Sequence, residues 1–520
     1  MKLPIKNALI SVYNKEGIIN FAKELSKFGV NIIATSGTAL KLSENGIKVR
    51  KVEEVAGSPE LLGGRVKTLQ PEIFAAILAD RRKEEHLTQL NSFGLDPIDL
   101  VVVNLYPFEY GKRKFLEEEE LIELIDIGGA SLLRAGAKNY KFCVVLMSSS
   151  DYGGFLQEMR SNKGKVSLSY RKKQSQKVFQ LLYHYNKEIA DYFFKSSHEE
   201  KELFPDTFSV NLRKVMDLRY GENPHQKSAL YRGVEGGISL VDADILSGKL
   251  MSYNNWMDAD AAIGVVSEFA KPAVSIVKHA APCGVGIGNN ILEAFDKAYK
   301  TDPVSSFGGI IVANRGIDLK TAENITSSFF EVIIAPSYKK EALKKLKEKK
   351  NLRILKVDQT IFSPSPFLRC YPIKGGVLLQ ETDCKVSEVD EWKVVSDREP
   401  TQEELKGLDF TWKVAKWVKS NGIVLGKGDR TIGIGTGQPS RVDSVKLAVK
   451  KAKLLGHSTV DTVLASDGFF PFRDSIDEAK KAGVTAVVEP GGSIRDKEVI
   501  TAANENRMSL LFTGVRHFRH

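Results

Sequence analysis

The chain has 520 residues, more than one ordinary hydrophobic core accommodates, so two or more domains are expected. Hydrophobic residues make up 42% of the sequence and charged residues 27%, which is typical of globular proteins. No run of apolar residues is long enough to span a membrane, and the N-terminal apolar run is too short for a secretory signal. The expected compartment is therefore the cytoplasm.

The 75 basic and 65 acidic residues give a formal charge of +10, which suits either nucleic acid or small polyanionic substrates. The densest basic stretch, residues 338–356, interleaves glutamates and leucines and lacks interleaved aromatic residues. This pattern favours a solvated helix face over a nucleic-acid surface. The four cysteines form no CxxC pair, so they are expected to be reduced thiols without a disulfide or zinc role.

The N-terminal region alternates strand and helix signals. Residues 7–13 predict a strand, and apolar residues at helical spacing follow until Gly29 ends the helix. A second strand, "VNIIA", precedes "TSGT" and a short helix, and residues 98–108 contain a buried strand closed by Pro107. This order predicts a mostly parallel sheet with helices on its faces and ligands at the carboxyl ends of its strands.

Residues 160–205 are polar, charged and helix-prone, which predicts a connection, and a second α/β region begins near residue 206. Within that region "CGVGIG", a helix and "FGGIIVANR" are matched by "IGIGTGQ", a helix and "TVLASDGFFPFRD". The repeated order of glycine turn, helix and strand predicts two duplicated subdomains.

The N-terminal region carries a first group of candidate site residues. The hydroxyls of "TSGT" lie at a predicted helix start and suit a phosphate, although they could simply cap the helix. Further along the chain come Arg65, Lys67, Tyr106, Asp126 and Lys138. Two lysines, a tyrosine and an aspartate on the loops of one sheet can polarise a carbonyl and move protons. Each alone could equally be a surface ion-pair residue.

A second candidate lies in "AVSIVKHAAPCG". The apolar run predicts a buried strand that ends at Lys278 and His279, and Pro282 and Gly284 are expected to supply the turn. His279 has the pKa range of a general base, and Lys278 could hold a developing negative charge. The alternative is a packed histidine beside an exposed lysine.

These blocks and several others together resemble the bifunctional purine-biosynthesis family that joins AICAR transformylase to IMP cyclohydrolase (AICAR is 5-aminoimidazole-4-carboxamide ribonucleotide). In chain order the matching blocks are "GGRVKTL", "NLYPF", "DIGGASLLRAGAKN", "LRYGENPHQ", "SYNNWMDADAA", "KHAAPCG", "SFGGIIVANR", "IGIGTGQPSRVDS", "ASDGFFPFRDSIDEAKKAG", "PGGSIRD" and "RHFRH". The chain departs from the family at Ala281, at Gln70 and in a shortened stretch from about 335 to 400.

The resemblance implies an α/β fold in which a methylglyoxal-synthase-like parallel domain precedes two duplicated cytidine-deaminase-like subdomains. It implies a cyclohydrolase domain at 1–195, with its core at 1–150 and a helical connection after it. A transformylase domain would follow at 196–520, with subdomains at about 196–365 and 366–520.

The resemblance also implies two reactions. A formyl group passes from 10-formyltetrahydrofolate, the cosubstrate, to the 5-amino group of AICAR, and the product FAICAR then closes to IMP with loss of water. It implies no catalytic metal, small-molecule substrates without nucleic acid or membrane, and a homodimer with transformylase sites at the interface.

The resemblance further assigns residues to the two sites, with the C-terminal "RHFRH" folded back into the transferase site. The implied catalytic residues are Lys278, His279 and Asn421 for transfer, and Lys67, Tyr106, Asp126 and Lys138 for ring closure. The implied cyclohydrolase substrate contacts are Ser11, Lys15, Thr35, Ser36, Gly37, Thr38, Arg65, Thr68, Asn104 and Gly128. The implied AICAR contacts in the transformylase are Arg219, Tyr220, Asn254, Phe307, Gly308, Arg441, Phe469, Arg516 and Phe518. The implied folate contacts are Glu331, Pro471, Phe472, Asp474 and His520.

Three other readings of the sequence compete with this one. A zinc deaminase needs a second cysteine two residues beyond its Pro-Cys pair, but position 286 is glycine, and His279 lacks a neighbouring glutamate. A nucleic-acid-binding protein would need basic surfaces without interleaved glutamates. A methylglyoxal-synthase-like enzyme would explain only residues 1–150.

Overall fold

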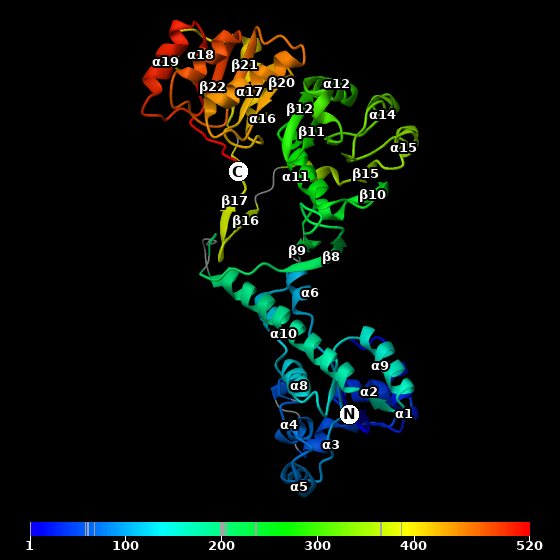
Figure 1. Cartoon of the computed structure of the whole chain (residues 1–520). Helices are drawn as coiled ribbons and strands as arrows, with labels where there is room; N and C mark the ends of the chain where they lie inside the picture. The colour runs from blue at the N-terminus through cyan, green and yellow to red at the C-terminus, as the bar shows by residue number, and fades with distance from the viewer. Residues whose placement is uncertain are drawn as a thin grey trace. The chain divides into compact units, whose positions relative to one another are not determined.

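The computed structural model describes residues 2–57, 59, 62–66, 68–197, 203–204, 206–233, 237–363, 367–385 and 387–520. The chain forms two compact units, Met1–Phe208 and Ser209–His520 (Figure 1). The predicted boundary at 195/196 falls inside the last turn of helix α10 (Leu168–Ser197), whereas the units divide after that helix. Among the described residues, no helix combines the length and apolar character needed to cross a membrane.

The first unit is built on a five-stranded parallel sheet in the order β4-β3-β2-β5-β6. Its strands are β2 (Asn7–Val12), β3 (Asn31–Ala34), β4 (Arg50–Lys51), β5 (Leu100–Asn104) and β6 (Val144–Leu146); β1 (Leu3–Pro4) and β7 (Lys165–Val166) form a separate pair. Its helices are α1 (Ile18–Lys27), α2 (Ser36–Ser43), α3 (Val52–Ala56), the 3₁₀ turn η1 (Leu62–Gly64), α4 (Pro71–Leu78), α5 (Glu84–Ser92), α6 (Phe108–Arg113), α7 (Glu118–Ile122), α8 (Ile127–Lys138), α9 (Ser150–Ser161) and α10. The parallel α/β fold predicted for this region is confirmed.

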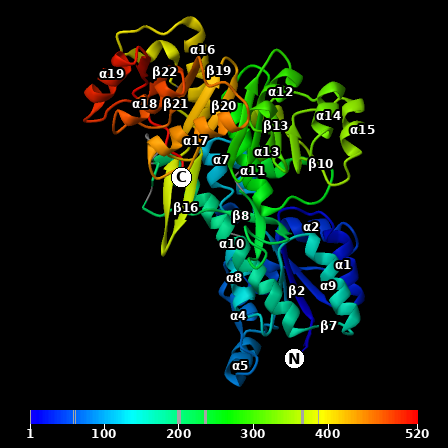
Figure 2. The ribbon, with the colours of Figure 1, turned by 45° about the horizontal axis from the view of Figure 1, so that its top comes forward.

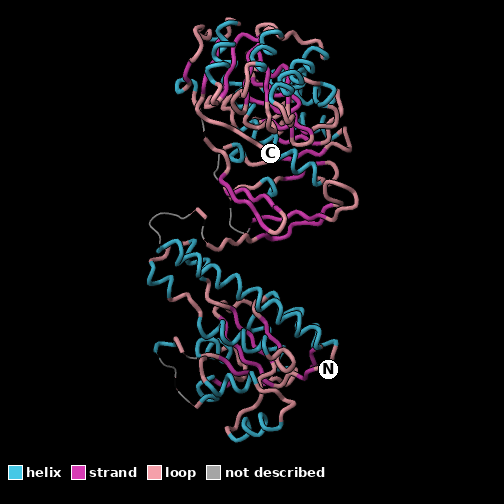
Figure 3. The backbone as a smooth tube through the Cα atoms, turned by 60° about the vertical axis from the view of Figure 1, so that its left-hand side comes forward, coloured by secondary structure: helices cyan, strands magenta, loops and turns pink. Residues whose placement is uncertain are grey.

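Helices cover both faces of this sheet. Successive strand residues point to opposite faces, so each strand contributes side chains to both layers. Ala8 and Ile10 pack with α1, α2 and α9, whereas Leu9 packs with α4, α8 and α10. Figure 2 shows α1 and α9 on one side of β2 and α8 on the other, and the long helix α10 runs beside the sheet in Figure 3. The hydrophobic core continues beyond residue 150, since Phe155 of α9 and Val178 of α10 are fully buried in it.

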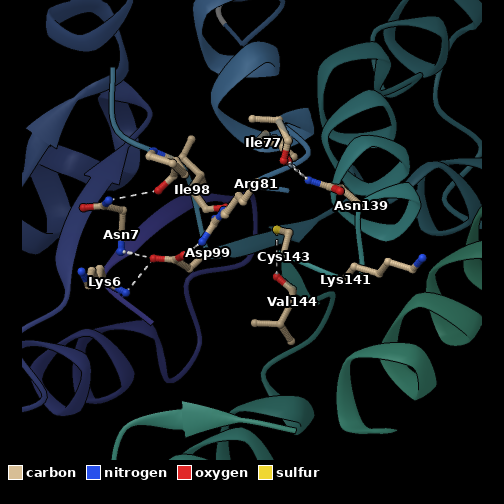
Figure 4. A network of polar contacts seen from close by, with 12 residues as sticks. Lys6, Asn7, Ile77, Arg81, Ile98, Asp99, Asn139, Lys141, Cys143 and Val144 are labelled. Carbon is tan, nitrogen blue, oxygen red and sulfur yellow. Dashed lines mark hydrogen bonds and ion pairs between the residues drawn. The ribbon is translucent and has the colours of Figure 1, made fainter. Parts of the chain in front are cut away.

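A buried carboxylate ties together the amino ends of the central strands (Figure 4). Asp99 accepts hydrogen bonds from the backbone N–H groups of Lys6 and Asn7 at 2.7 and 2.8 Å. Arg81 donates to the same carboxylate at 2.6 Å and to the carbonyl of Ile98 at 3.1 Å. Since the side chain of Asp99 is 3% exposed, this ion pair is held away from water.

We expect Asp99→Ala to lower the free energy of unfolding of the first unit by about 3–5 kcal/mol, because Arg81 would lose its buried partner. Hydrogen exchange of amides in residues 1–208 measures this change. Asp96→Ala is the matched control, since Asp96 is exposed just before the same strand, and should change the free energy by less than about 0.5 kcal/mol. Equal protection in the two variants would show that the ion pair does not stabilise the sheet.

The second unit contains a twelve-stranded sheet in the order β10-β15-β14-β13-β11-β12-β20-β19-β21-β22-β23-β18. Its strands are β10 (Asp244–Ser247), β11 (Ala273–Lys278), β12 (Ala281–Ile287), β13 (Ile310–Ala313), β14 (Val332–Ala335), β15 (Arg353–Lys356), β18 (Lys393–Val394), β19 (Ile423–Lys427), β20 (Arg430–Gly435), β21 (Thr462–Ser466), β22 (Val484–Glu489) and β23 (Ser509–Phe512). Two hairpins lie outside it: β8 (Leu212–Leu218) with β9 (Ser228–Gly233), and β16 (Leu368–Ile373) with β17 (Gly376–Glu381).

The two halves of this sheet repeat one topology. Outward from the central β12–β20 pair, the order β12-β11-β13-β14-β15 is matched by β20-β19-β21-β22-β23. The helices are α11 (Tyr253–Ser267), α12 (Ile291–Thr301), α13 (Pro303–Ser306), α14 (Leu319–Thr326) and α15 (Lys340–Lys347) in the first half, α16 (Gln402–Ala415), α17 (Arg441–Leu454), α18 (Asp474–Lys481) and α19 (Asp496–Glu505) in the second, and the 3₁₀ turns η2 (Leu240–Asp242), η3 (Gln359–Phe362) and η4 (Val389–Glu391). The predicted duplication is therefore confirmed.

The repeated glycines serve helix packing in both halves. A Cβ added at Gly284 of β12 would lie 2.0 Å from the carbonyl oxygen of Ala298 in α12. At the matching Gly433 of β20 it would lie 2.3 Å from the carbonyl oxygen of Ala448 in α17. The helix backbone thus rests directly on the strand in each half, which only a residue without a side chain permits. This requirement explains why the glycine pattern recurs in the sequence.

We expect Gly284→Ala and Gly433→Ala each to destabilise the second unit by at least about 1–3 kcal/mol, because the helix must move off the strand. Tryptophan fluorescence during urea denaturation reports this unit selectively, since all four tryptophans lie between residues 256 and 417. Gly376→Ala in β17 is the control, because its added Cβ would make only an ordinary 3.6 Å contact with Ile373. A loss of stability in the control as large as in the other two would contradict the packing argument.

Candidate active sites

A cavity of about 510 Å³ opens at the carboxyl ends of β2, β3 and β5 in the first unit. The loops after these strands supply its lining together with the start of α8 and residues near η1. The predicted cyclohydrolase residues that line it are Ser11, Lys15, Thr35, Gly37, Thr38, Arg65, Thr68, Asn104, Tyr106, Asp126 and Gly128. Residues that are far apart in the sequence thus meet where ligands bind in parallel α/β sheets.

Asn104 shapes the wall of the cavity at the end of β5. Its side-chain oxygen accepts hydrogen bonds from the backbone N–H groups of Tyr13 and Asn14 at 2.6 and 3.0 Å. Its amide nitrogen donates to the carbonyl of Asn14 at 2.8 Å. Beside this loop the rings of Tyr13 and Tyr106 meet edge to face at 5.4 Å. Asn104 therefore holds the loop that leads to Lys15, and sequence reasoning missed Tyr13 as part of the lining.

Two helices begin at this cavity. Helix α2 starts after Thr35, and helix α8 starts after Asp126. Free N–H groups and the helix dipole give each of these ends a partial positive charge, which favours an anionic group such as a phosphate. Gly128 lies within α8's first turn, where an added Cβ would come within 2.4 Å of the Thr68 hydroxyl. Its missing side chain allows Thr68 to approach the helix start.

Asp126 is held at the N-terminus of α8 by hydrogen bonds of its backbone and its side chain. Its carboxylate accepts from the backbone N–H of Gly129 at 2.6 Å and caps the helix. Tyr185 of α10 accepts from the backbone N–H of Asp126 at 2.7 Å and donates to the carbonyl of Leu124 at 2.8 Å. Burial raises the pKa of Tyr185 to about 12, so its hydroxyl remains protonated and keeps donating at neutral pH.

Some predicted residues are not brought into this cavity. Ser36 is outside the lining and donates to the carboxylate of Glu53 at 2.7 Å. Lys138 is the last residue of α8, about 18 Å along the helix from Asp126 at 1.5 Å per residue. Lys138 is not among the residues that line the cavity. Lys67 lies outside the described residues.

In the second unit the structure places a sharp turn at the lysine–histidine pair. Strand β11 ends at Lys278 and β12 begins at Ala281, and the two residues between them have φ angles of 57° and 56°. The expectation that Pro282 and Gly284 make this turn is wrong, since both lie inside β12 and pair with β11. His279 and Ala280 make the turn themselves, in the left-handed region that favours glycine.

Lys278 reaches two residues of the predicted AICAR site. Its ammonium group donates to the carbonyl of Phe307 at 2.7 Å and lies 3.9 Å from the position of an added Cβ on Gly308. The ring of Phe307 lies 5.1 Å from that of Phe329. The lysine is therefore oriented toward the loop before β13.

Glu331, predicted to contact folate, is held in place by two neighbours. Asn255 of α11 donates to its carboxylate at 2.9 Å, and Arg353 of β15 approaches it at 3.5 Å. Asn255 is buried, whereas the predicted Asn254 is exposed and donates to the carbonyl of Glu222 at 3.4 Å. The sequence did not indicate Asn255, the asparagine that contacts Glu331.

Asn421 and Arg441 form one hydrogen-bonded cluster in the second half of the unit. The guanidinium group of Arg441 donates to the side-chain oxygen of Asn421 at 2.7 Å and to the hydroxyl of Ser466 at 2.9 Å. It also forms an ion pair with Asp467, which is fully buried. The amide of Asn421 donates to the carbonyl of Gln438 at 2.9 Å. Two residues predicted separately are thus directly bonded.

The C-terminal segment packs against this cluster. The ring of Phe518 lies 5.7 Å from the guanidinium carbon of Arg441 and 4.3 Å from that of Arg516. The backbone N–H of His517 donates to the carbonyl of Asp467 at 3.0 Å. His517 and Asp467 were missed in the sequence, because nothing local to either residue indicates this contact.

Several of the remaining predicted residues make contacts with aromatic rings. Arg219 stacks over the ring of Tyr220 at 5.5 Å. Arg495 stacks over Phe472 at 4.6 Å, and His520 lies 6.0 Å from Phe518. Phe469 and Pro471 lie between β21 and α18, and Asp474 is the first residue of α18.

The turn at His279 and the Asn421–Arg441 cluster lie at the same end of the central strands of the twelve-stranded sheet. Gly286 of β12 pairs antiparallel with Arg430 of β20. The start of β12 and the end of β20 therefore lie on the same side of the sheet, where neighbouring strands end. Gly435 at that end of β20 pairs with Ile423, two residues after Asn421. Among the described residues, no group of three or more His, Cys, Asp or Glu side chains could hold a metal ion.

The two units thus define an α/β enzyme with a nucleotide-sized cavity in one unit and a lysine–histidine turn in the other. Comparison with protein families matches residues 17–131 to an MGS-like domain and residues 136–451 to the AICARFT/IMPCHase bienzyme. Proteins named bifunctional purine biosynthesis protein PurH are similar along the whole chain. Those of Persephonella marina and Acetivibrio thermocellus are each 48% identical over 99% of this chain and 100% of their own length.

A third such relative, from Acidithiobacillus ferrooxidans, is 46% identical over 99% of both chains. The chain therefore belongs to the AICARFT/IMPCHase bienzyme family. It is a bifunctional enzyme of purine biosynthesis with AICAR formyltransferase and IMP cyclohydrolase activities.

Proposed function

We propose that the cavity of the first unit closes the ring of FAICAR and that the end of the central strands carrying Lys278 and His279 in the second unit transfers the formyl group. The observation that carries this division is the separation of the two residue sets. Tyr106 and Asp126 line a cavity at two helix N-termini in the first unit. The lysine–histidine turn belongs to the second unit.

Formyl transfer begins with a weakly nucleophilic amine, since the lone pair of the AICAR 5-amino group is delocalised into the ring and its carboxamide. His279 takes the proton of that amine as the nitrogen attacks the formyl carbon of 10-formyltetrahydrofolate. Lys278 stabilises the oxyanion of the tetrahedral intermediate. Asn421, bonded to Arg441, positions the transferred group, and tetrahydrofolate then leaves.

Ring closure is intramolecular, so the cavity mainly holds a reactive conformer and moves protons. The start of α2 with Thr35 and Thr38, together with Lys15 and Arg65, receives the phosphate. Tyr106 protonates the formyl oxygen while the carboxamide nitrogen attacks the formyl carbon, and Asp126 assists the proton transfer that releases water. Lys67 keeps its predicted role in polarising the formyl oxygen. Lys138, at the far end of α8 and outside the cavity lining, keeps its predicted role in assisting proton transfer.

We further propose that the chain acts in the cytoplasm as a homodimer whose transferase sites lie at the subunit interface. The formal charge of +10 supports substrates that carry phosphate or carboxylate groups.

The test supplies the purified chain with AICAR and 10-formyltetrahydrofolate and follows tetrahydrofolate and IMP separately, with and without a chelator. We expect both products at equal rates in the two conditions. If tetrahydrofolate is not released, the transferase assignment is wrong. If the chelator stops its release, a metal-dependent site of the deaminase kind would have to replace it.

A further inference from the structure

The turn between β11 and β12 has a backbone conformation that is unfavourable for the residues that form it. His279 and Ala280 both have positive φ angles, 57° and 56°, and neither is glycine. Side chains with a Cβ atom disfavour this region, and two such residues in succession are rarer than one. Some other part of the structure must therefore hold the turn in this shape.

Asp258 is the group that holds it. This residue lies in the middle of α11 and is 8% exposed. One carboxylate oxygen accepts the backbone N–H of His279 at 3.1 Å, and the other accepts the backbone N–H of Ala280 at 2.5 Å. Each carboxylate oxygen thus accepts a hydrogen bond from the backbone of one of the two residues in the left-handed region. A helix that is itself packed in the core thereby fixes the turn.

The second half of the sheet supplies an internal comparison. There β19 and β20 are joined through Gly428, whose φ angle is 59°. Lys427 matches Lys278, since its ammonium group donates to the carbonyl of Val460 just before the third strand of that half. The lysine contact is therefore shared by both repeats.

The helix residue that lies against the turn differs between the two halves. In the second half it is Gly407 of α16, where an added Cβ would lie 3.8 Å from the backbone nitrogen of Gly428. A glycine turn needs no external support in the left-handed region. The carboxylate thus occurs in the half whose turn carries a histidine, and a glycine takes its place in the half whose turn is glycine.

We propose that Asp258 is a positioning residue for formyl transfer, which holds the strained His279–Ala280 turn so that the imidazole faces the substrate amine. This inference rests on the proposed role of His279 as the general base. Asp258 itself touches no reacting atom. Burial raises the pKa of Asp258, and the two N–H donors oppose that rise, as expected for a carboxylate whose charge is used by backbone groups.

The test compares Asp258→Asn with Ala280→Gly and with the double variant. Asparagine keeps the size of the side chain but offers one acceptor, and its amide group opposes the second N–H donor. We expect Asp258→Asn to lower kcat for formyl transfer by about 10- to 100-fold, because small displacements of a catalytic group are costly. The KM for AICAR should change much less. Adding Ala280→Gly should restore most of the lost rate, since glycine adopts the turn without support.

Two controls separate positioning from damage to the fold. Asp260→Asn makes the same substitution at an exposed site two residues further along α11 and should leave kcat unchanged. Ring closure from FAICAR, which we assign to the first unit, should be unchanged in every variant. The inference is overturned if Asp258→Asn retains full kcat while His279→Ala is slowed as expected. It is also overturned if the double variant is as slow as Asp258→Asn. If His279→Ala transfers the formyl group at the wild-type rate, the proposed function is wrong, whatever the result for Asp258→Asn.

Discussion

His279→Ala should lower the rate of formyl transfer by about 100- to 10,000-fold, the usual contribution of a positioned general base. The amine of AICAR would then have to lose its proton to water while it attacks the formyl carbon. Lys278 would still stabilise the oxyanion, so some transfer should remain. The measurement is the release of tetrahydrofolate at saturating AICAR.

The same preparation should convert FAICAR to IMP at the wild-type rate, because the first unit does not contain this turn. His457→Ala is a matched control in the second unit. The ring of His457 contacts the carbonyl of Thr301 at 3.0 Å, so it is a structural histidine. Normal formyl transfer by His279→Ala, or an equal loss in His457→Ala, would contradict the assignment of the base.

Much of the fold could be predicted because its signals are local. The mostly apolar run from Asn7 to Val12 is the central strand β2, and Gly29 follows the end of α1 with a φ angle of 74°. The repeat of glycine, helix and strand was visible in the second unit and corresponds to a true duplication. Patterns of this kind depend on neighbours in sequence.

The contacts that complete the sites could not be predicted in this way. Asp258 and His279 are 21 positions apart, and no spacing rule joins a helix residue to a turn beyond the next strand. Asp467 meets the tail at His517 only because β21 and the C-terminus converge in space. Conversely, Asp126 and Lys138 are close in sequence, yet one continuous helix keeps them apart. Such relations follow from tertiary packing, which the sequence pattern does not encode locally.

The second large effect is expected at Asp126, where two substitutions distinguish its role as the helix cap from its proposed role in proton transfer. Asparagine is as good a helix N-cap as aspartate, so Asp126→Asn should keep the hydrogen bond from Gly129 while removing the negative charge. We expect this variant to close the ring of FAICAR about 100- to 10,000-fold more slowly, because the proton acceptor is lost. Its stability should be close to that of the wild type.

Asp126→Ala should show the same slow ring closure and, in addition, a loss of about 0.5–2 kcal/mol in unfolding free energy, because α8 also loses its cap. The formation of IMP from FAICAR measures the first effect, and hydrogen exchange of residues 127–138 measures the second. Release of tetrahydrofolate should be unchanged in both variants, which shows that the second unit is intact. If Asp126→Asn closes the ring normally while Asp126→Ala does not, the carboxylate serves only to cap α8, and proton transfer must be assigned to Tyr106 and its neighbours in the cavity.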